Sequence, residues 1–130
     1  MQFKSISLAV ICVVALATPV LAHHSHGNYD ASKWSLIEGT VRELHIINPH
    51  SWIYMDIKDD TGNSAVWAIE ATGAIDLRRK GINIDAIRPG DTIEVRCHLQ
   101  RDGGPGCLLG FVTPLHGDAA RGHGVETEWD

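Results

Sequence analysis

The chain has 130 residues, of which 44% are hydrophobic and 21% charged, and this composition fits one small globular domain and excludes two. Its formal net charge of −5 comes from 16 acidic and 11 basic side chains, and this excludes a general binder of nucleic acid or of anionic membranes. Eight histidines and three cysteines are the unusual part of the composition.

Residues 1–22 have the pattern of a secretory signal peptide. Lys4 gives a positive start, residues 6–17 are almost wholly apolar, and Val20 and Ala22 occupy the −3 and −1 positions of a cleavage site. A retained membrane anchor is the alternative, but it needs about 20 apolar residues, and this stretch is interrupted by Ser7, Thr18 and Pro19. We therefore expect cleavage after Ala22, a periplasmic or secreted protein, and no membrane span afterwards.

Cleavage leaves a histidine-rich segment, residues 23–34, followed by a body at residues 35–116. β-favouring residues and period-two alternation predict strands in this body, and a charged stretch that loses this period before Gly81 predicts a short helix. The expected elements are strands at 36–46, 52–57, 65–70, 92–99 and 108–114, with the helix at 74–80. The last residues, 117–130, have little left to bury and are expected to form a flexible acidic tail.

Cys97 and Cys107 are the cysteines that remain after cleavage, because Cys12 leaves with the signal peptide. Each lies on the apolar face of its predicted strand, and the turn-forming residues between them favour a hairpin that brings the two thiols together. A structural disulfide is therefore predicted. Two buried thiols are the alternative, and a metal pair is disfavoured by the spacing of nine residues.

Three strands, a short helix and two more strands are the order of an OB-type barrel. We therefore predict an all-β fold, a five-stranded OB-like small barrel with its short helix between strands 3 and 4. A small open β-sandwich or half barrel of the same strand count is the alternative. Neither fold defines a function, because such barrels bind many kinds of ligand.

Short motifs along the mature chain resemble a family of small exported bacterial proteins of unknown function. The resemblance covers most of the mature chain, and its specificity lies in the order and spacing of the motifs. The motifs are His23-His24-Ser25, Gly39-Thr40-Val41, Asn48-Pro49-His50, the segment 67–70 and Pro89-Gly90-Asp91. The resemblance implies an exported single-domain protein with an OB-like body, and it implies no established activity.

The new N-terminus is the candidate metal site. The α-amine and imidazole of His23 can chelate one ion, and a second imidazole from His24 or His50 would give three nitrogen donors. Nitrogen donors favour copper(II) among the common divalent ions, and an amine with a pKa near 8 deprotonates readily for a bound metal. The simpler interpretation is a solvated terminus that takes up metal adventitiously.

Other candidate residues have structural interpretations as well. His50 can cap the Asn48-Pro49 turn, and Glu70 can be an ordinary solvent-exposed residue at a strand end. Three tryptophans can form an aromatic ligand surface or pack in the core and rim. These are Trp34, Trp52 and Trp67.

We therefore expect a small periplasmic binding protein whose partner is a metal ion. We expect the ion to be copper or a similar ion, with His23, His24 and His50 as its ligands. An envelope protein-interaction module without metal is the alternative. A copper-dependent oxidase is the weaker third reading, because the sequence has no recognisable catalytic constellation.

Overall fold

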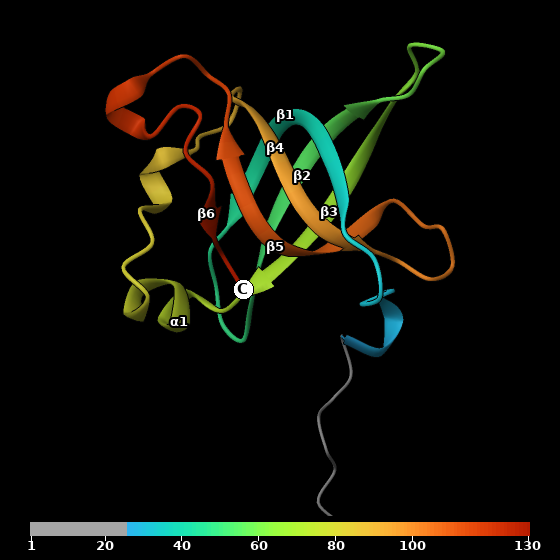
Figure 1. Ribbon diagram of the computed structural model, residues 1–130, viewed down its shortest axis with the longest axis horizontal. Coiled ribbons are helices and arrows are strands. Elements are labelled where there is room, and N and C mark those ends of the chain that lie inside the picture. The colour runs from blue at the N-terminus through green and yellow to red at the C-terminus, as the bar shows by residue number, and fades with distance from the viewer. Residues whose placement is uncertain (1–25) are drawn as a thin grey trace, which may run out of the picture.

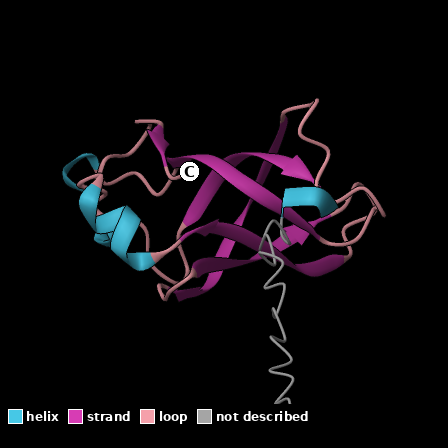
Figure 2. Ribbon diagram, turned by 90° about the horizontal axis from the view of Figure 1, so that it is seen from below, coloured by secondary structure: helices cyan, strands magenta, loops and turns pink. Residues whose placement is uncertain are grey.

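The computed structural model describes residues 26–130, and six strands and four short helical turns make up this part of the chain. The five long strands curve around one core, with the helical turns at the side and ends of the barrel (Figures 1 and 2). The elements are η1 (His26–Asn28), β1 (Ser35–His45), β2 (His50–Lys58), β3 (Ser64–Thr72), α1 (Ala74–Arg79), η2 (Ile84–Ala86), β4 (Thr92–Leu99), β5 (Gly106–Pro114), η3 (Ala119–Arg121) and β6 (Thr127–Glu128).

The sheet closes into a barrel through one parallel contact. Antiparallel pairing gives the strand order β3-β2-β1-β4-β5-β6, and β3 also pairs in parallel with β5 at Ala68, Ile69 and Glu70. β1 serves two neighbours, because its residues 35–40 pair with β4 and its residues 40–45 pair with β2. The predicted all-β, five-stranded OB-like barrel with a short helix between strands 3 and 4 is confirmed.

The alternation seen in the sequence produces the core. In β2 and β4 every second side chain is buried, including Ile53, Met55, Ile93 and Val95. Helix α1 adds Leu77, which is fully buried. The apolar side chains of the curved sheet therefore meet in one hydrophobic core.

Cys97 and Cys107 both lie in this core with no exposed surface. Their Cα atoms are 5.8 Å apart and their sulfur atoms are at bonding distance, 2.08 Å. The predicted pairing is thus supported by the structure. The pair joins β4 to β5 beside the turn that connects them.

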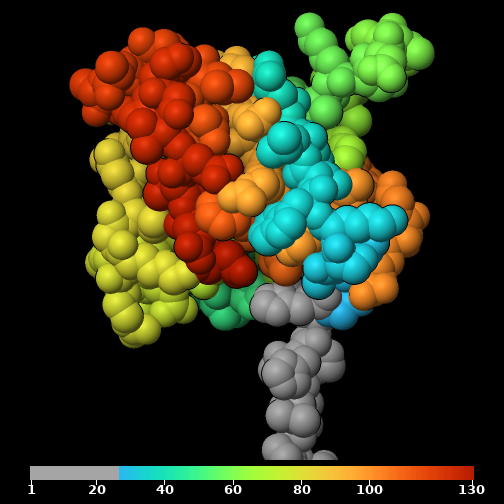
Figure 3. Space-filling model, in the orientation of Figure 1, coloured from blue at the N-terminus to red at the C-terminus, as the bar shows by residue number. Residues whose placement is uncertain are grey.

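The C-terminal segment, residues 117–130, differs from the flexible acidic tail that the sequence suggested. Trp129 is only 2% exposed and belongs to the core, and its backbone N–H donates to the carbonyl of Gly110 at 2.8 Å. β6 pairs with Phe111 and Val112 of β5. The expectation that this segment has little to bury is wrong, because its tryptophan lies twelve residues beyond Gly117, at a place that local composition does not reveal. In Figure 3 this segment, in dark red, crosses the surface between α1 and β5.

An ion pair ties the same segment to the turn before β4. The Arg121 guanidinium donates to both carboxylate oxygens of Asp91, at 2.6 and 3.2 Å, and also to Asp118. The Asp91 and Arg121 side chains are 14% and 20% exposed. The hydrogen bonds from Arg121 hold the pKa of Asp91 below its usual value.

Replacing Asp91 with asparagine is expected to lower the free energy of unfolding at pH 7 by about 1–2 kcal/mol. The pKa of Asp91 is lower in the folded state than in the unfolded state, so this stabilisation is present above the unfolded value, near 3.9, and is lost as the pH falls through the folded pKa. Urea denaturation at pH 7 and at pH 3 measures the difference. If the difference in unfolding free energy between wild type and variant is as large at pH 3 as at pH 7, the ion pair does not lower the pKa of Asp91.

Candidate functional site

A buried carboxylate joins two distant parts of the chain at one end of the barrel. Glu70 is the last residue of β3 that pairs with β5, and its side chain is buried, at 3% exposure. The Tyr29 hydroxyl donates to its Oε2 at 2.6 Å, and His50 Nδ1 contacts its Oε1. Each carboxylate oxygen therefore has its own partner, as a buried carboxylate requires.

Local structure explains why the side chains of His50 and Glu70 meet. His50 begins β2 and pairs in register with Thr72, near the end of β3 that also carries Glu70. The preceding loop is held close, because Asn48 Oδ1 accepts from the N–H of Ile75 and the carbonyl of Ile47 accepts from that of Ala74. The loop passes so near Gly73 that a Cβ atom there would lie 2.5 Å from the Pro49 carbonyl oxygen.

The contact with Glu70 fixes the orientation of the His50 ring. Because a carboxylate only accepts hydrogen bonds, Nδ1 is the donor in this contact, and Nε2 is the ring nitrogen that takes no part in it. The His50 side chain is 39% exposed, whereas its partner is buried. Histidines that ligate metal ions usually donate their other ring N–H to a carboxylate, carbonyl or water, and the His50–Glu70 contact has this form.

Tyr29 is buried as deeply as Glu70, at 3% exposure. Burial, together with the hydrogen bond and the negative charge of Glu70, raises the pKa of the Tyr29 hydroxyl above its ordinary range. The phenol therefore stays protonated and acts as a donor at neutral pH. No sequence pattern singles out this tyrosine.

The predicted site residues have different outcomes. His50 lies at the barrel end described above and is bound to Glu70, and the Asn48-Pro49 turn precedes it. His23 and His24 lie outside the described residues. Glu70 is buried rather than solvent-exposed, because Tyr29, His50 and β5 cover it. Among the described residues, no group of three histidine, cysteine, aspartate or glutamate side chains is arranged to hold a metal ion.

Trp34 belongs to the barrel rim. It is 50% exposed, its ring lies 3.9 Å from that of His98, and a Cβ atom at Gly110 would lie 2.5 Å from it. Trp67 packs against the core. Trp67 therefore has the packing interpretation, whereas Trp34 packs on the rim with half of its surface exposed.

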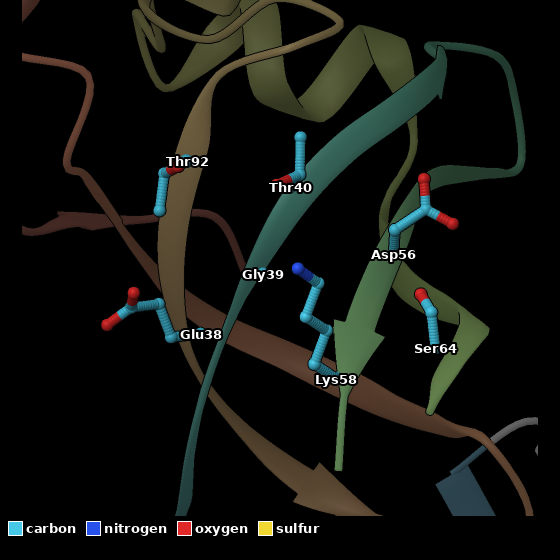
Figure 4. A pocket seen from close by; sticks show the side chains of 7 residues that line it. All are labelled: Glu38, Gly39, Thr40, Asp56, Lys58, Ser64 and Thr92. Carbon is cyan, nitrogen blue, oxygen red and sulfur yellow. The ribbon is translucent and has the colours of Figure 1, made fainter. Parts of the chain in front are cut away.

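A groove lies between β1 and the β2–β3 hairpin, away from the buried carboxylate. This groove has a volume of about 350 Å³ and is lined mainly by polar side chains. Lys58 extends across it toward β1, as Figure 4 shows. Its mixed charges, from Glu38, Asp56 and Lys58, indicate no particular ligand.

Comparison with known proteins identifies the family of the chain. A family model matches residues 9–109, which include Tyr29, His50 and Glu70. The chain belongs to a family of unknown function, DUF6152. This confirms the expected membership of a family without assigned activity. The packed segment 117–130 lies beyond the part that the family model matches.

No curated protein matches the chain. Among solved structures, the chain is similar to Rim1, a mitochondrial single-stranded DNA-binding protein from S. cerevisiae. The two are 10% identical with a TM-score of 0.49, and the match covers 66% of this chain and 96% of the other. Within residues 26–130, no helix has the length and apolar character to cross a bilayer.

Proposed function

We propose that this DUF6152 protein is an exported metal-binding protein that holds copper(II), or a similar ion, with His50 and the histidines of its mature N-terminus. Export rests on the signal-peptide pattern of residues 1–22, and a disulfide-distance cysteine pair is consistent with an oxidising compartment. The acidic net charge of −5 gives no support to nucleic acid as the partner.

The observation that carries the proposal is the contact between His50 and Glu70. A buried carboxylate behind the imidazole fixes its tautomer and raises its basicity as a ligand. A second histidine–glutamate contact differs from it in burial. His45 Nε2 lies 3.0 Å from a carboxylate oxygen of Glu43, and the two side chains are 48% and 58% exposed. Of these two pairs, the His50 pair has the buried carboxylate, and each oxygen of that carboxylate has its own hydrogen-bond partner.

The remaining donors would come from His23 and His24. Tyr29, bonded to the same carboxylate as His50, follows His23 by six residues, a length of chain that spans at most about 20 Å. This length allows the N-terminal amine and imidazoles to reach His50. Together they would supply the nitrogen donors that copper(II) favours, and the amine of His23 would close a chelate with its own imidazole.

Copper titration of the protein that begins at His23 tests this function. We expect His50→Ala to lower copper(II) affinity by more than about tenfold, and one extra residue before His23 to do the same. His45→Ala is the matched control and should leave the affinity unchanged. Equal binding by the wild type, the His50→Ala variant and the extended protein would overturn the proposal in favour of an adventitious terminus.

The copper-loaded protein also separates a carrier from an oxidase. We expect it to hold the ion without sustained turnover of ascorbate or peroxide, because the sequence has no recognisable catalytic constellation. Sustained turnover lost in His50→Ala would instead establish the oxidase.

A protein-interaction module is the second candidate function. It is favoured by the exposure of Trp34 and Leu36, at 50% and 63%, at the start of β1. Single exposed apolar residues are common on soluble proteins, so this observation is weaker than the buried carboxylate. Copper binding that does not depend on His50 would make this the leading candidate.

A further inference from the structure

The outer surface of the sheet formed by β1, β4, β5 and β6 carries a tryptophan that is exposed and yet held in place. The centroid of the Trp34 ring lies 3.9 Å from that of His98 and 5.7 Å from that of Phe111. The ring also packs on Gly110, where a Cβ atom would lie 2.5 Å from it. Half of the Trp34 surface remains exposed. A rigid indole loses little conformational freedom when a partner covers it, and tryptophan often contributes strongly to protein interfaces.

Strand register places a second exposed apolar side chain on the same face. Leu36 of β1, which is 63% exposed, pairs with Arg96 of β4, and Arg96 pairs in turn with Phe111 of β5. The Arg96 guanidinium lies 3.8 Å from the centroid of the Phe111 ring and forms an ion pair with Glu126 at 2.8 Å. The cation on this face is therefore already paired. Figure 3 shows the face, with β1 in cyan beside β4 in light orange.

Two carboxylates next to this apolar surface lie directly opposite each other. Glu38 of β1 pairs in register with Glu94 of β4, two positions along both strands from the Leu36–Arg96 pair and hence on the same face. Within the described part of the chain, neither carboxylate forms an ion pair. Figure 4 shows the Glu38 side chain pointing away from Lys58. Like charges directly opposite each other destabilise a sheet, and a cation supplied by a partner would remove this repulsion.

We propose that the face formed by Trp34, Leu36, Glu38 and Glu94 docks a basic segment of another protein, in which lysine or arginine residues accompany apolar side chains. The cations lie against the two glutamates, and the apolar side chains cover Trp34 and Leu36. The net charge of −5 favours this partner, because it attracts a basic chain and repels both phosphate-bearing surfaces and a second copy of this chain. The inference does not rest on copper binding, and it gives the interaction module considered above a class of partner.

A synthetic peptide of alternating lysine and leucine is the probe, and a peptide of alternating glutamate and leucine is the control. We expect the lysine peptide to bind and to shift the indole N–H signal of Trp34 in a nitrogen–proton NMR correlation spectrum. Its affinity should fall as salt is added, because salt screens the attraction between exposed charges. Equal binding of the two peptides, or binding of neither at low salt, would overturn the proposal.

The double variant Glu38→Gln/Glu94→Gln tests the charges. We expect it to bind the lysine peptide about tenfold more weakly, and to resist urea at least as well as the wild type because the repulsion between the strands is removed. Asp60→Asn/Asp85→Asn is the matched control, since it removes the same charge from two exposed residues elsewhere and should retain wild-type affinity. Equal affinities of the two double variants, or a glutamine variant less stable than the wild type, would overturn the proposal.

Leu36→Ala tests the apolar part of the face. Because Leu36 is largely exposed, we expect this variant to fold as the wild type does and to bind the lysine peptide about fivefold more weakly. Ile75→Ala, on α1, truncates a side chain of similar exposure, 53%, and should leave the affinity unchanged. Wild-type affinity in Leu36→Ala would contradict the proposal. Copper binding by His50→Ala tests the proposed function separately, and its outcome does not bear on this one.

Discussion

Trp129→Ala is expected to lower the free energy of unfolding by about 3–5 kcal/mol, the cost of removing a fully buried tryptophan from a core. The indole is 2% exposed and belongs to the same core cluster as Leu77 and Leu109. Urea denaturation followed by circular dichroism measures the change. A large effect would show that residues 117–130 stabilise the whole barrel, although only two residues of this segment pair with β5.

Val125→Ala is the matched control for this experiment, since it lies in the same segment but is 60% exposed. We expect it to change stability by less than about 0.5 kcal/mol. If Trp129→Ala and Val125→Ala unfold at the same urea concentration as the wild type, the packing of residues 117–130 on the barrel would be refuted.

Replacing both Cys97 and Cys107 with alanine is expected to cost about 2–3 kcal/mol. The pair closes a short loop, with a sequence separation of 10, and a cross-link of this size mainly restricts the unfolded chain. The loss of two fully buried sulfur atoms acts in the same direction. Thermal unfolding of the wild type and of the double variant measures the difference.

Reductant provides the control for the cysteine experiment. Dithiothreitol should lower the midpoint of the wild type once the chain unfolds and exposes the bond, and it should leave the double variant unaffected. A wild-type midpoint that is the same with and without reductant would contradict a structural role for the pair.

The regular part of the fold could be predicted because it follows from local alternation. β4 has the expected bounds, Thr92–Leu99, and its buried positions are the apolar ones that the sequence shows. β5 begins at Gly106, two residues earlier than expected, because it pairs there with β3 at Ala68. That contact joins residues about 40 positions apart, so no short sequence window contains it.

The candidate site was predictable only in part, for the same reason. The motif Asn48-Pro49-His50 drew attention to His50, but its partner Glu70 looked like an ordinary strand-end residue. Alternation correctly puts Glu70 opposite Ile69, on the side away from the core, and it cannot show that Tyr29 covers that side. Trp129 was missed likewise, because it is an isolated apolar residue among charged ones.

The sharing of Glu70 also has an evolutionary consequence. The two oxygens of Glu70 bind Tyr29 and His50 separately. Losing the carboxylate would therefore leave two side chains without their hydrogen-bond partner, and losing either side chain would leave a buried oxygen without a donor. Substitutions at these three positions are therefore expected to occur together among relatives. A relative that lacks one of the three residues is expected to lack the other two, including the histidine at position 50.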